Sequence, residues 1–127
     1  MHPLGVGIDI VYVPRIKNLL ERYKTRFLKK IFTEEEIAYA FRKKDPTLPL
    51  SSAFAVKEAF YKALGGYRPF CFKEISLLRD KTSGRPCIVL SGLAEELFKK
   101  RGGKKIDLSI SHDFNYTIAI VQLWGEE

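Results

Sequence analysis

The first apolar run of the chain, residues 6–11, has the two-residue period of a β-strand. Val6, Ile8 and Ile10 share one face of this strand, and Asp9 points to the other face. A carboxylate within so apolar a run is costly to bury unless it meets solvent, a cation or a metal ion. Asp9 is therefore the first candidate for chemistry, although an edge-strand position would also explain it.

Three helices are predicted after this strand. The first opens at Pro14, and the second spans 33–43 from a capping box in "TEEE". After the break "DPTLPL", Ser51 or Ser52 caps the third helix, which the glycine pair at 65–66 ends. The apolar positions of the first helix recur at helical spacing and are Ile16, Leu19, Leu20, Tyr23 and Phe27.

The remaining chain alternates strands with one helix. Residues 71–80 and 86–90 have strand composition and flank a glycine-containing turn, and a serine-capped helix follows over 91–101. The chain then closes as a hairpin of two strands, 106–111 and 116–124, around the polar turn "HDFN". This order predicts an α+β fold, with helices packed on a mixed or antiparallel sheet.

Composition is that of a globular domain with an excess of basic residues. A length of 127 residues is about one domain, so a single domain over residues 1–127 is expected. The hydrophobic fraction is 46% and the charged fraction 29%, as in ordinary folded chains. Lys and Arg number 22 against 15 Asp and Glu, a net charge of +7, which favours anionic partners such as nucleic acids, phosphorylated cofactors or acidic proteins.

The start of the chain indicates a cytoplasmic protein without a membrane anchor. "MHPLGVGIDIVYV" has no basic n-region, and its apolar run is short, so neither a signal peptide nor a membrane span is expected. Cys71 and Cys87 have no metal-like spacing, and we expect them to be reduced.

The predicted third helix carries a second candidate for chemistry. Glu58 and Lys62 lie one turn apart, nearly opposite its apolar stripe. On pattern alone this is a surface pair worth about 0.2–0.5 kcal/mol. Together with Asp9, however, two carboxylates and a lysine suit a Mg²⁺ ion bound to a substrate phosphate.

Three blocks of sequence, in order, resemble the acyl-carrier-protein synthase family of 4′-phosphopantetheinyl transferases. They are "GVGIDIVYVPRI", "FAVKEAFYKALG" and "SISHDFNYTIAIV", and a smaller match is "SGRPCI". The blocks run from residue 5 to residue 121, so the resemblance covers nearly the whole chain. The residues that they contribute are Asp9, Arg15, Lys57, Glu58, Lys62, Ser111 and His112.

The resemblance implies an enzyme with the 4′-phosphopantetheinyl transferase fold. Such an enzyme moves the 4′-phosphopantetheine arm of coenzyme A to a serine hydroxyl of apo acyl carrier protein, releases 3′,5′-ADP and supports fatty acid biosynthesis. By the same resemblance, Asp9 and Glu58 hold Mg²⁺, with Mn²⁺ as an alternative. Glu58 is the candidate base for the serine, directly or through a water, and Lys62 stabilises the departing phosphate.

The resemblance also implies binding surfaces and an assembly. Ser111 and His112 belong to the pocket for the nucleotide 3′-phosphate of coenzyme A, and the turn of Gly84, Arg85 and Pro86 belongs to its nucleotide side. The family is homotrimeric with active sites between subunits. A basic row on the first helix suits an acidic carrier protein, and its residues are Arg15, Arg22 and Arg26 with Phe27 beside them.

Two departures from the family pattern stand out. Many relatives have Arg where this chain has Ala53, and Lys43, Lys44 or Arg68 are the alternatives for that charge. Asp113, an anion, follows His112 directly.

Two other function classes are alternatives. The net charge of +7 also suits a nucleic-acid-binding module, although no RNP, KH or zinc pattern supports one. A reading of "GVGIDI" as the phosphate strand of an actin-like sugar kinase would need a chain more than twice as long.

Overall fold

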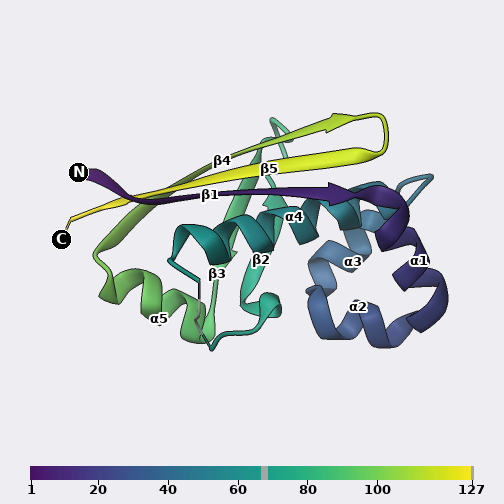
Figure 1. Cartoon of the computed structure of the whole chain (residues 1–127), viewed down its shortest axis with the longest axis horizontal. Coiled ribbons are helices and arrows are strands. Elements are labelled where there is room, and N and C mark those ends of the chain that lie inside the picture. Colours follow the sequence, from purple (N-terminus) through teal and green to yellow (C-terminus); the bar gives the residue numbers. More distant parts are fainter. Residues whose placement is uncertain (67–68, 127) are drawn as a thin grey trace.

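The computed structural model describes residues 1–66 and 69–126 and is built around one long helix, α4. A three-stranded antiparallel sheet in the order β1-β5-β4 packs on α4 (Figure 1). The bounds are β1 (His2–Tyr12), β5 (Tyr116–Gly125), β4 (Gly103–Asp113) and α4 (Thr47–Ala63).

Smaller elements surround α4 on its other sides. Strands β2 and β3 form an antiparallel pair, helices α1, α2 and α3 gather near one end of α4, and α5 lies toward the other (Figure 1). Their bounds are α1 (Val13–Tyr23), α2 (Thr25–Ile31), α3 (Glu34–Phe41), the 3₁₀ turn η1 (Phe72–Glu74), β2 (Ile75–Arg79), β3 (Pro86–Leu90) and α5 (Gly92–Lys100). The predicted α+β class is confirmed, with both sheets antiparallel. No helix in this described part is long and apolar enough to cross a membrane.

The predicted start of the third helix was wrong. Helix α4 begins at Thr47, and the amide of Thr47 donates to the Asp45 side chain at 3.0 Å. The hydroxyls of Ser51 and Ser52 are inside the helix and donate to main-chain carbonyls four residues earlier, so neither serine is the cap. Pro49 is tolerated because amides of the first helical turn have no intrahelical partner.

The first predicted helix is divided in two. Lys24 adopts φ 47° between α1 and α2, and this left-handed backbone ends α1. The capping box of α3 is confirmed, because Thr33 and Glu36 exchange side-chain and main-chain hydrogen bonds. At α5 the Ser91 hydroxyl makes no capping bond, and the Glu74 carboxylate accepts from the Ala94 amide instead, at 3.1 Å.

Two glycines allow a close backbone contact between β1 and α4. A Cβ atom at Gly7 would lie 1.9 Å from the Ala59 carbonyl oxygen, and one at Gly5 would lie 2.0 Å from that of Ala63. Only glycine therefore allows the strand to lie against the helix backbone. Asp9, two residues along the same face of β1, is thereby carried to the side of α4.

The other face of β1 is apolar and exposed. Val6, Ile8 and Ile10 are 57–58% exposed, and Ile118 and Ile120 of β5 continue the patch at 38% and 42%. These five side chains form the outer sheet face. The predicted opposition of Asp9 to Val6, Ile8 and Ile10 is confirmed, but it is Asp9, on the partly buried face, that turns toward the helix.

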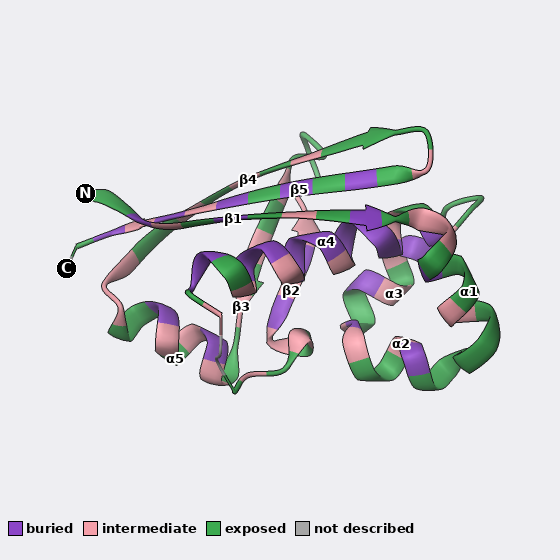
Figure 2. Cartoon of the chain, in the orientation of Figure 1, coloured by how far each residue is buried: buried purple, intermediate pink, exposed green. Residues whose placement is uncertain are grey.

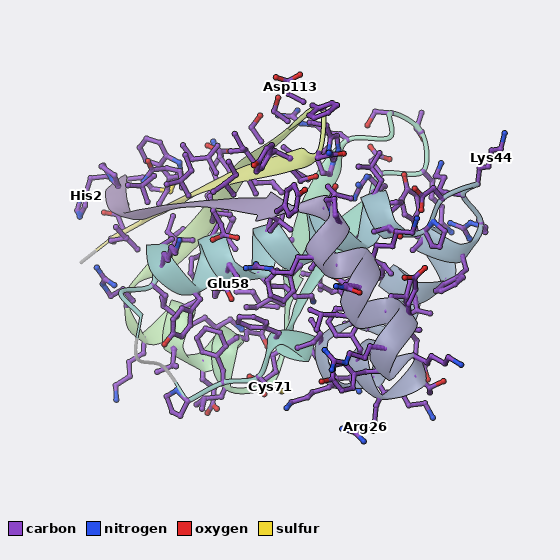
Figure 3. All side chains as sticks on the ribbon, turned by 45° about the vertical axis from the view of Figure 1, so that its right-hand side comes forward. His2, Arg26, Lys44, Glu58, Cys71 and Asp113 are labelled. Atoms are coloured by element: carbon purple, nitrogen blue, oxygen red, sulfur yellow. The ribbon has the colours of Figure 1, made fainter. Side chains whose placement is uncertain are left out.

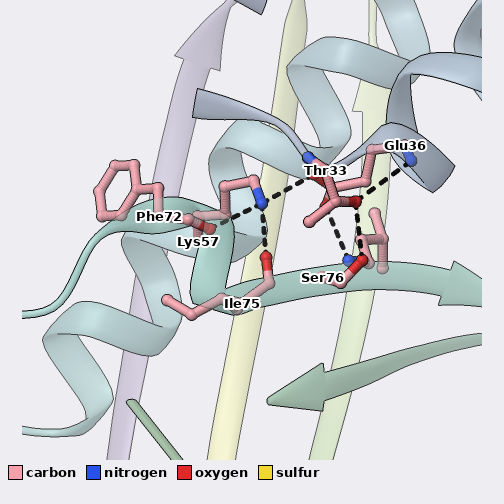
Figure 4. Close-up of polar contacts among 7 residues, drawn as sticks. Thr33, Glu36, Lys57, Phe72, Ile75 and Ser76 are labelled. Carbon is pink, nitrogen blue, oxygen red and sulfur yellow. Dashed lines mark hydrogen bonds and ion pairs between the residues drawn. The ribbon is translucent and has the colours of Figure 1, made fainter. Parts of the chain in front are cut away.

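A buried ion pair anchors α4 on the side away from the sheet. Among the helices α4 carries most of the buried positions (Figure 2), and one of these is Lys57. The Lys57 ammonium lies 2.8 Å from the Glu36 carboxylate and donates to the carbonyls of Phe72 and Ile75 (Figure 4). Glu36 in turn accepts from the Leu77 amide at 2.7 Å. Burial lowers the pKa of Lys57, and the Glu36 charge opposes that shift. The pair ties α3, α4 and β2 together.

We expect Gly7→Ala to lower the free energy of unfolding by about 3 kcal/mol or more, because overpacking against a helix backbone cannot be relieved by a side-chain rotation. Urea denaturation followed by circular dichroism measures this. Gly84→Ala is the matched control: its Cβ meets open space, and only its φ of 75° adds a cost of about 1–2 kcal/mol. Equal losses in the two variants would contradict the close-contact explanation.

Candidate active site

Asp9, Glu58 and Lys62 meet where β1 crosses α4. The Lys62 ammonium donates to Asp9 Oδ1 at 3.1 Å and to the Ile8 carbonyl at 3.0 Å. The Asp9 side chain is 15% exposed and that of Lys62 50% exposed. Glu58 lies on the same helix beneath β1 (Figure 3). Lys62 is thus paired across the two elements with Asp9 and is not simply the surface partner of Glu58.

The electrostatics of Glu58 reflect this crowding. Its carboxyl is half-buried, and burial together with the Asp9 charge raises its pKa above the ordinary value. The cations of Lys62 and Arg15 act in the opposite direction. A carboxylate held in this way is closer to the pKa that a base needs near neutral pH.

The donor set suits a Mg²⁺ ion that shares its ligands with a substrate. No group of three or more His, Cys, Asp and Glu side chains within the described ranges could hold a metal ion. Two neighbouring carboxylates are what Mg²⁺ uses when phosphate oxygens and waters complete its shell. Asp9 and Glu58 therefore fit the predicted ion, whereas a closed protein-only metal site does not fit.

His112 lies on the third strand of the sheet, away from Asp9. Its Nδ1 is 2.8 Å from the Thr117 hydroxyl and its Nε2 is 3.4 Å from the Ser52 hydroxyl. Burial and the nearby Arg79 charge lower its pKa. Ser52 and Glu58 are six residues apart on α4, about 9 Å along the helix axis.

A pocket of about 330 Å³ beside His112 is lined by two cations, Lys43 and Arg79, and one anion, Asp45. The cations of Lys43 and Arg79 each lie 4.8 Å from the centre of the Tyr39 ring, and Arg42 lies 5.7 Å from it. Arg79 was missed from the sequence because nothing in a β-strand pattern reveals which loop or helix it will face. The residues that line the pocket include Tyr39, Lys43, Ser52, Arg79 and His112.

The expected contributions of Ser111 and Asp113 differ from that of His112. Ser111 pairs with Ile118 and Asp113 with Tyr116, so both share the outer face and lie opposite His112. Within one chain the structure therefore separates Ser111 from the His112 pocket. The Asp113 anion likewise points away from this pocket.

The structure gives positions for two of the three residues that could replace the charge of the family arginine. Ala53 is 2% exposed inside α4. Of the substitutes considered, Lys43 lines the His112 pocket, Lys44 is exposed, and Arg68 lies outside the described residues.

The turn at Gly84 adjoins the His112 pocket, because Gly84 lines a groove of about 590 Å³ together with Tyr39, Lys43 and Arg79. Gly84 has φ 75°, which suits glycine, and the amide of Thr82 donates to Asp80 at 3.0 Å within the turn. Arg85 and Pro86 line a groove of about 750 Å³ between β3 and β4.

The predicted basic row is spread over two helices. Arg15 is exposed on α1. It is close enough to Glu58 for its positive charge to oppose part of the rise in the Glu58 pKa. Arg22 of α1 and Arg26 of α2 both lie over the Tyr23 ring, at 5.9 and 5.6 Å. Phe27, the aromatic expected beside this row, lines a groove together with Arg26. It is only 8% exposed and packs edge-on against Phe32, and Tyr23 is the more exposed aromatic there.

Comparisons with known proteins identify the family of the chain. The model of the 4′-phosphopantetheinyl transferase superfamily matches residues 5–121. The chain is 42% identical to a holo-[acyl-carrier-protein] synthase of Halothermothrix orenii over 97% of both chains. Its structure resembles that of the Neisseria meningitidis holo-[acyl-carrier-protein] synthase, with a TM-score of 0.88, 28% identity and 98% and 99% of the two chains covered.

A further solved structure, the Helicobacter pylori holo-[acyl-carrier-protein] synthase in complex with coenzyme A, matches with a TM-score of 0.81, 31% identity and 94% and 99% coverage. The chain belongs to the 4′-phosphopantetheinyl transferase superfamily. Within it, near-complete coverage by relatives of the same length puts the chain in the small holo-[acyl-carrier-protein] synthase branch, and it is a phosphopantetheinyl transferase.

The environment of Glu58 gives a direct test of the site geometry. In metal-free protein, Asp9→Asn should lower the Glu58 pKa because it removes a neighbouring anion, and Lys62→Met should raise it because it removes a cation. A ¹³C carboxyl titration by NMR measures both shifts, with Asp107→Asn as the control. Unchanged Glu58 titration in Asp9→Asn would mean that the two carboxylates are not neighbours.

Proposed function

We propose that this enzyme transfers the 4′-phosphopantetheine arm of coenzyme A to a serine hydroxyl of apo acyl carrier protein and releases 3′,5′-ADP. The observation that carries the proposal is the cluster at the crossing of β1 and α4, where Lys62 pairs with Asp9 beside a Glu58 of raised pKa. Two carboxylates and a cation on rigid elements suit phosphoryl transfer, which depends on positioning and charge neutralisation. The similar proteins from Halothermothrix orenii and Helicobacter pylori are both holo-[acyl-carrier-protein] synthases, and the second was solved in complex with coenzyme A.

In this mechanism Glu58 acts both as base and as metal ligand, whereas Lys62 and Asp9 have one role each. Glu58 accepts the proton of the serine hydroxyl while the serine oxygen bonds to the phosphorus that bears the arm, and the bond from that phosphorus to the oxygen of the leaving 3′,5′-ADP breaks. Lys62 offsets the negative charge that develops on the departing phosphate. Asp9 and Glu58 would hold Mg²⁺, or Mn²⁺, and a bound ion would neutralise the pyrophosphate.

Coenzyme A recognition is proposed to extend to the His112 pocket. His112, Lys43 and Arg79 there can donate charge-assisted hydrogen bonds to a phosphate group such as the nucleotide 3′-phosphate. The turn of Gly84, Arg85 and Pro86 would form the nucleotide side, as the resemblance implies. The lowered His112 pKa means that Lys43 and Arg79 supply the charge at neutral pH.

We propose a homotrimer whose neighbouring subunits complete each site. The outer sheet face exposes five aliphatic side chains on adjacent strands, and contiguous apolar surface of this kind is typical of subunit interfaces. Within one chain, the Asp9 cluster and the His112 pocket lie on different strands of the sheet. Assembly would let Ser111, on that outer face, approach a neighbour's site.

A groove next to the basic residues suits the carrier protein. It has a volume of about 530 Å³, and an acidic helical protein could place an apolar side chain in it while its carboxylates meet the arginines. Arg15, one helical turn before Leu19 of this groove and close enough to Glu58 for the two charges to interact, would then guide the carrier serine. The groove is lined by Leu19, Tyr23, Arg26, Phe27, Lys30, Ile31 and Phe54. A cytoplasmic location and a role in fatty acid biosynthesis complete the proposal.

The transfer itself is tested by the intact mass of apo acyl carrier protein after incubation with coenzyme A and Mg²⁺. We expect a phosphopantetheine-sized gain, and Glu58→Gln should slow it by about 10²–10⁴-fold because it removes the base. Lys62→Ala should also slow it strongly. The matched controls are Glu95→Gln and Lys99→Ala, a surface pair of the same spacing on α5. Wild-type rates in Glu58→Gln, or no gain with several carrier proteins, would overturn the proposal.

Carrier docking predicts a selective kinetic effect. Arg22→Glu should raise the KM for carrier protein about tenfold or more, with little change in the KM for coenzyme A, because it places an anion opposite an acidic partner. Lys100→Glu, an exposed basic residue on α5, is the control. Equal changes in both KM values would count against this surface.

The trimer predicts that Ile8→Lys yields monomers. A lysine on the outer sheet face would place a charge in the apolar interface, and light scattering coupled to size exclusion gives the mass. Activity should fall with the mass, since each site needs its neighbour. A fully active monomeric wild type at assay concentration would refute the shared site.

A further inference from the structure

The Lys62 ammonium is bound to groups of the protein itself, although half of the Lys62 side chain is exposed. Its ammonium donates to Asp9 Oδ1 at 3.1 Å and to the Ile8 carbonyl of β1, the edge strand of its sheet, at 3.0 Å. The Asp9 side chain is only 15% exposed. A long, mobile cation thus supplies the charge that this poorly solvated carboxylate needs.

The Asp9 carboxylate, which Lys62 contacts through Oδ1, is also the group that a divalent cation would use. Asp9 and Glu58 are close enough for the charge of one to affect the other, so a cation between them is strongly favoured. An ammonium ion 3 Å from Asp9 offsets one negative charge and also repels a second cation. Lys62 and a divalent ion therefore cannot both make their best contacts with Asp9.

We propose that Lys62 is a built-in counter-ion that competes with the divalent cation for Asp9 until coenzyme A is bound. This inference rests on the proposed function, which assigns the divalent ion to Asp9 and Glu58. The phosphate oxygens of coenzyme A offer Lys62 a stronger acceptor, and its transfer to them frees Asp9. Nucleotide and divalent cation consequently bind with positive coupling, and each raises the affinity of the other by the same factor.

The position of Lys62 permits this exchange. It lies in the last turn of α4, and its four-carbon stem carries three donors that can turn from one acceptor to another. Its two contacts are both on one side, toward β1. A partly exposed ion pair is weak, so a phosphate group can displace it.

The test is the affinity for Mn²⁺ without nucleotide, measured from the EPR signal of free Mn²⁺. Lys62→Met keeps the apolar stem and removes the charge, and we expect it to bind Mn²⁺ roughly tenfold more tightly than the wild type because the repulsion is gone. Lys99→Met, the matched surface lysine of α5, should bind as the wild type does. The double variant Asp9→Asn, Lys62→Met should lose the gain.

The coupling is measured by repeating the titrations with saturating coenzyme A. The wild type should gain more Mn²⁺ affinity from coenzyme A than Lys62→Met does, because only the wild type has an ammonium to move. Unchanged or weaker Mn²⁺ binding in Lys62→Met, or a gain that survives Asp9→Asn, would overturn the inference. The carrier mass assay on the wild type separates the two proposals: transfer with unchanged Mn²⁺ affinity in Lys62→Met overturns only the competition.

Discussion

The contact of β1 with α4 at Gly5 and Gly7 is the constraint on which the rest of the structure depends. Because no side chain separates strand from helix there, the two backbones approach closely enough for a carboxylate on the strand to meet side chains on the helix. Asp9 belongs to the sheet, whereas Glu58 and Lys62 belong to the helix, and neither element alone contains the cluster. The geometry of the site is therefore set by backbone packing, which is more rigid than any side-chain contact.

Two neighbouring residues of α4 have different roles: one anchors the helix and the other belongs to the candidate site. Lys57 is fully buried, and its contacts with Glu36 and two carbonyls tie α4 to α3 and to the segment before β2. Breaking a buried pair of this kind on one side typically costs about 3–5 kcal/mol. Glu58, the next residue, faces β1 instead. One side of α4 is thus fixed by buried contacts, and another side carries the reactive group. These contacts fix the rotation of α4 about its axis and so the direction in which Glu58 points.

The sequence was most informative where a single local interaction decides the outcome. The capping box at Thr33, the strand period around Asp9 and the closing hairpin were all predictable, because each depends on residues a few positions apart. The start of α4 was not, since Asp45 and a tolerated proline outweigh the serine caps. Arg79 joins the His112 pocket through tertiary packing alone, and the burial of Phe27 was equally hidden. The site roles of Asp9, Glu58 and Lys62 came from family motifs, and the structure adds their proximity.

Alternation along β1 has a consequence for how this strand can change. Odd positions from Gly5 to Val11 face the helix and carry the glycines and Asp9, whereas even positions from Val6 to Ile10 carry the exposed aliphatic face. A single inserted or deleted residue inside this stretch would invert everything after it, exchanging aliphatic side chains with a carboxylate. The exposed even positions can therefore accept replacements one at a time, but the length of the strand between Gly5 and Val11 is fixed. Variation in length is confined to the residues before Gly5, where the pairing with β5 already shifts its register.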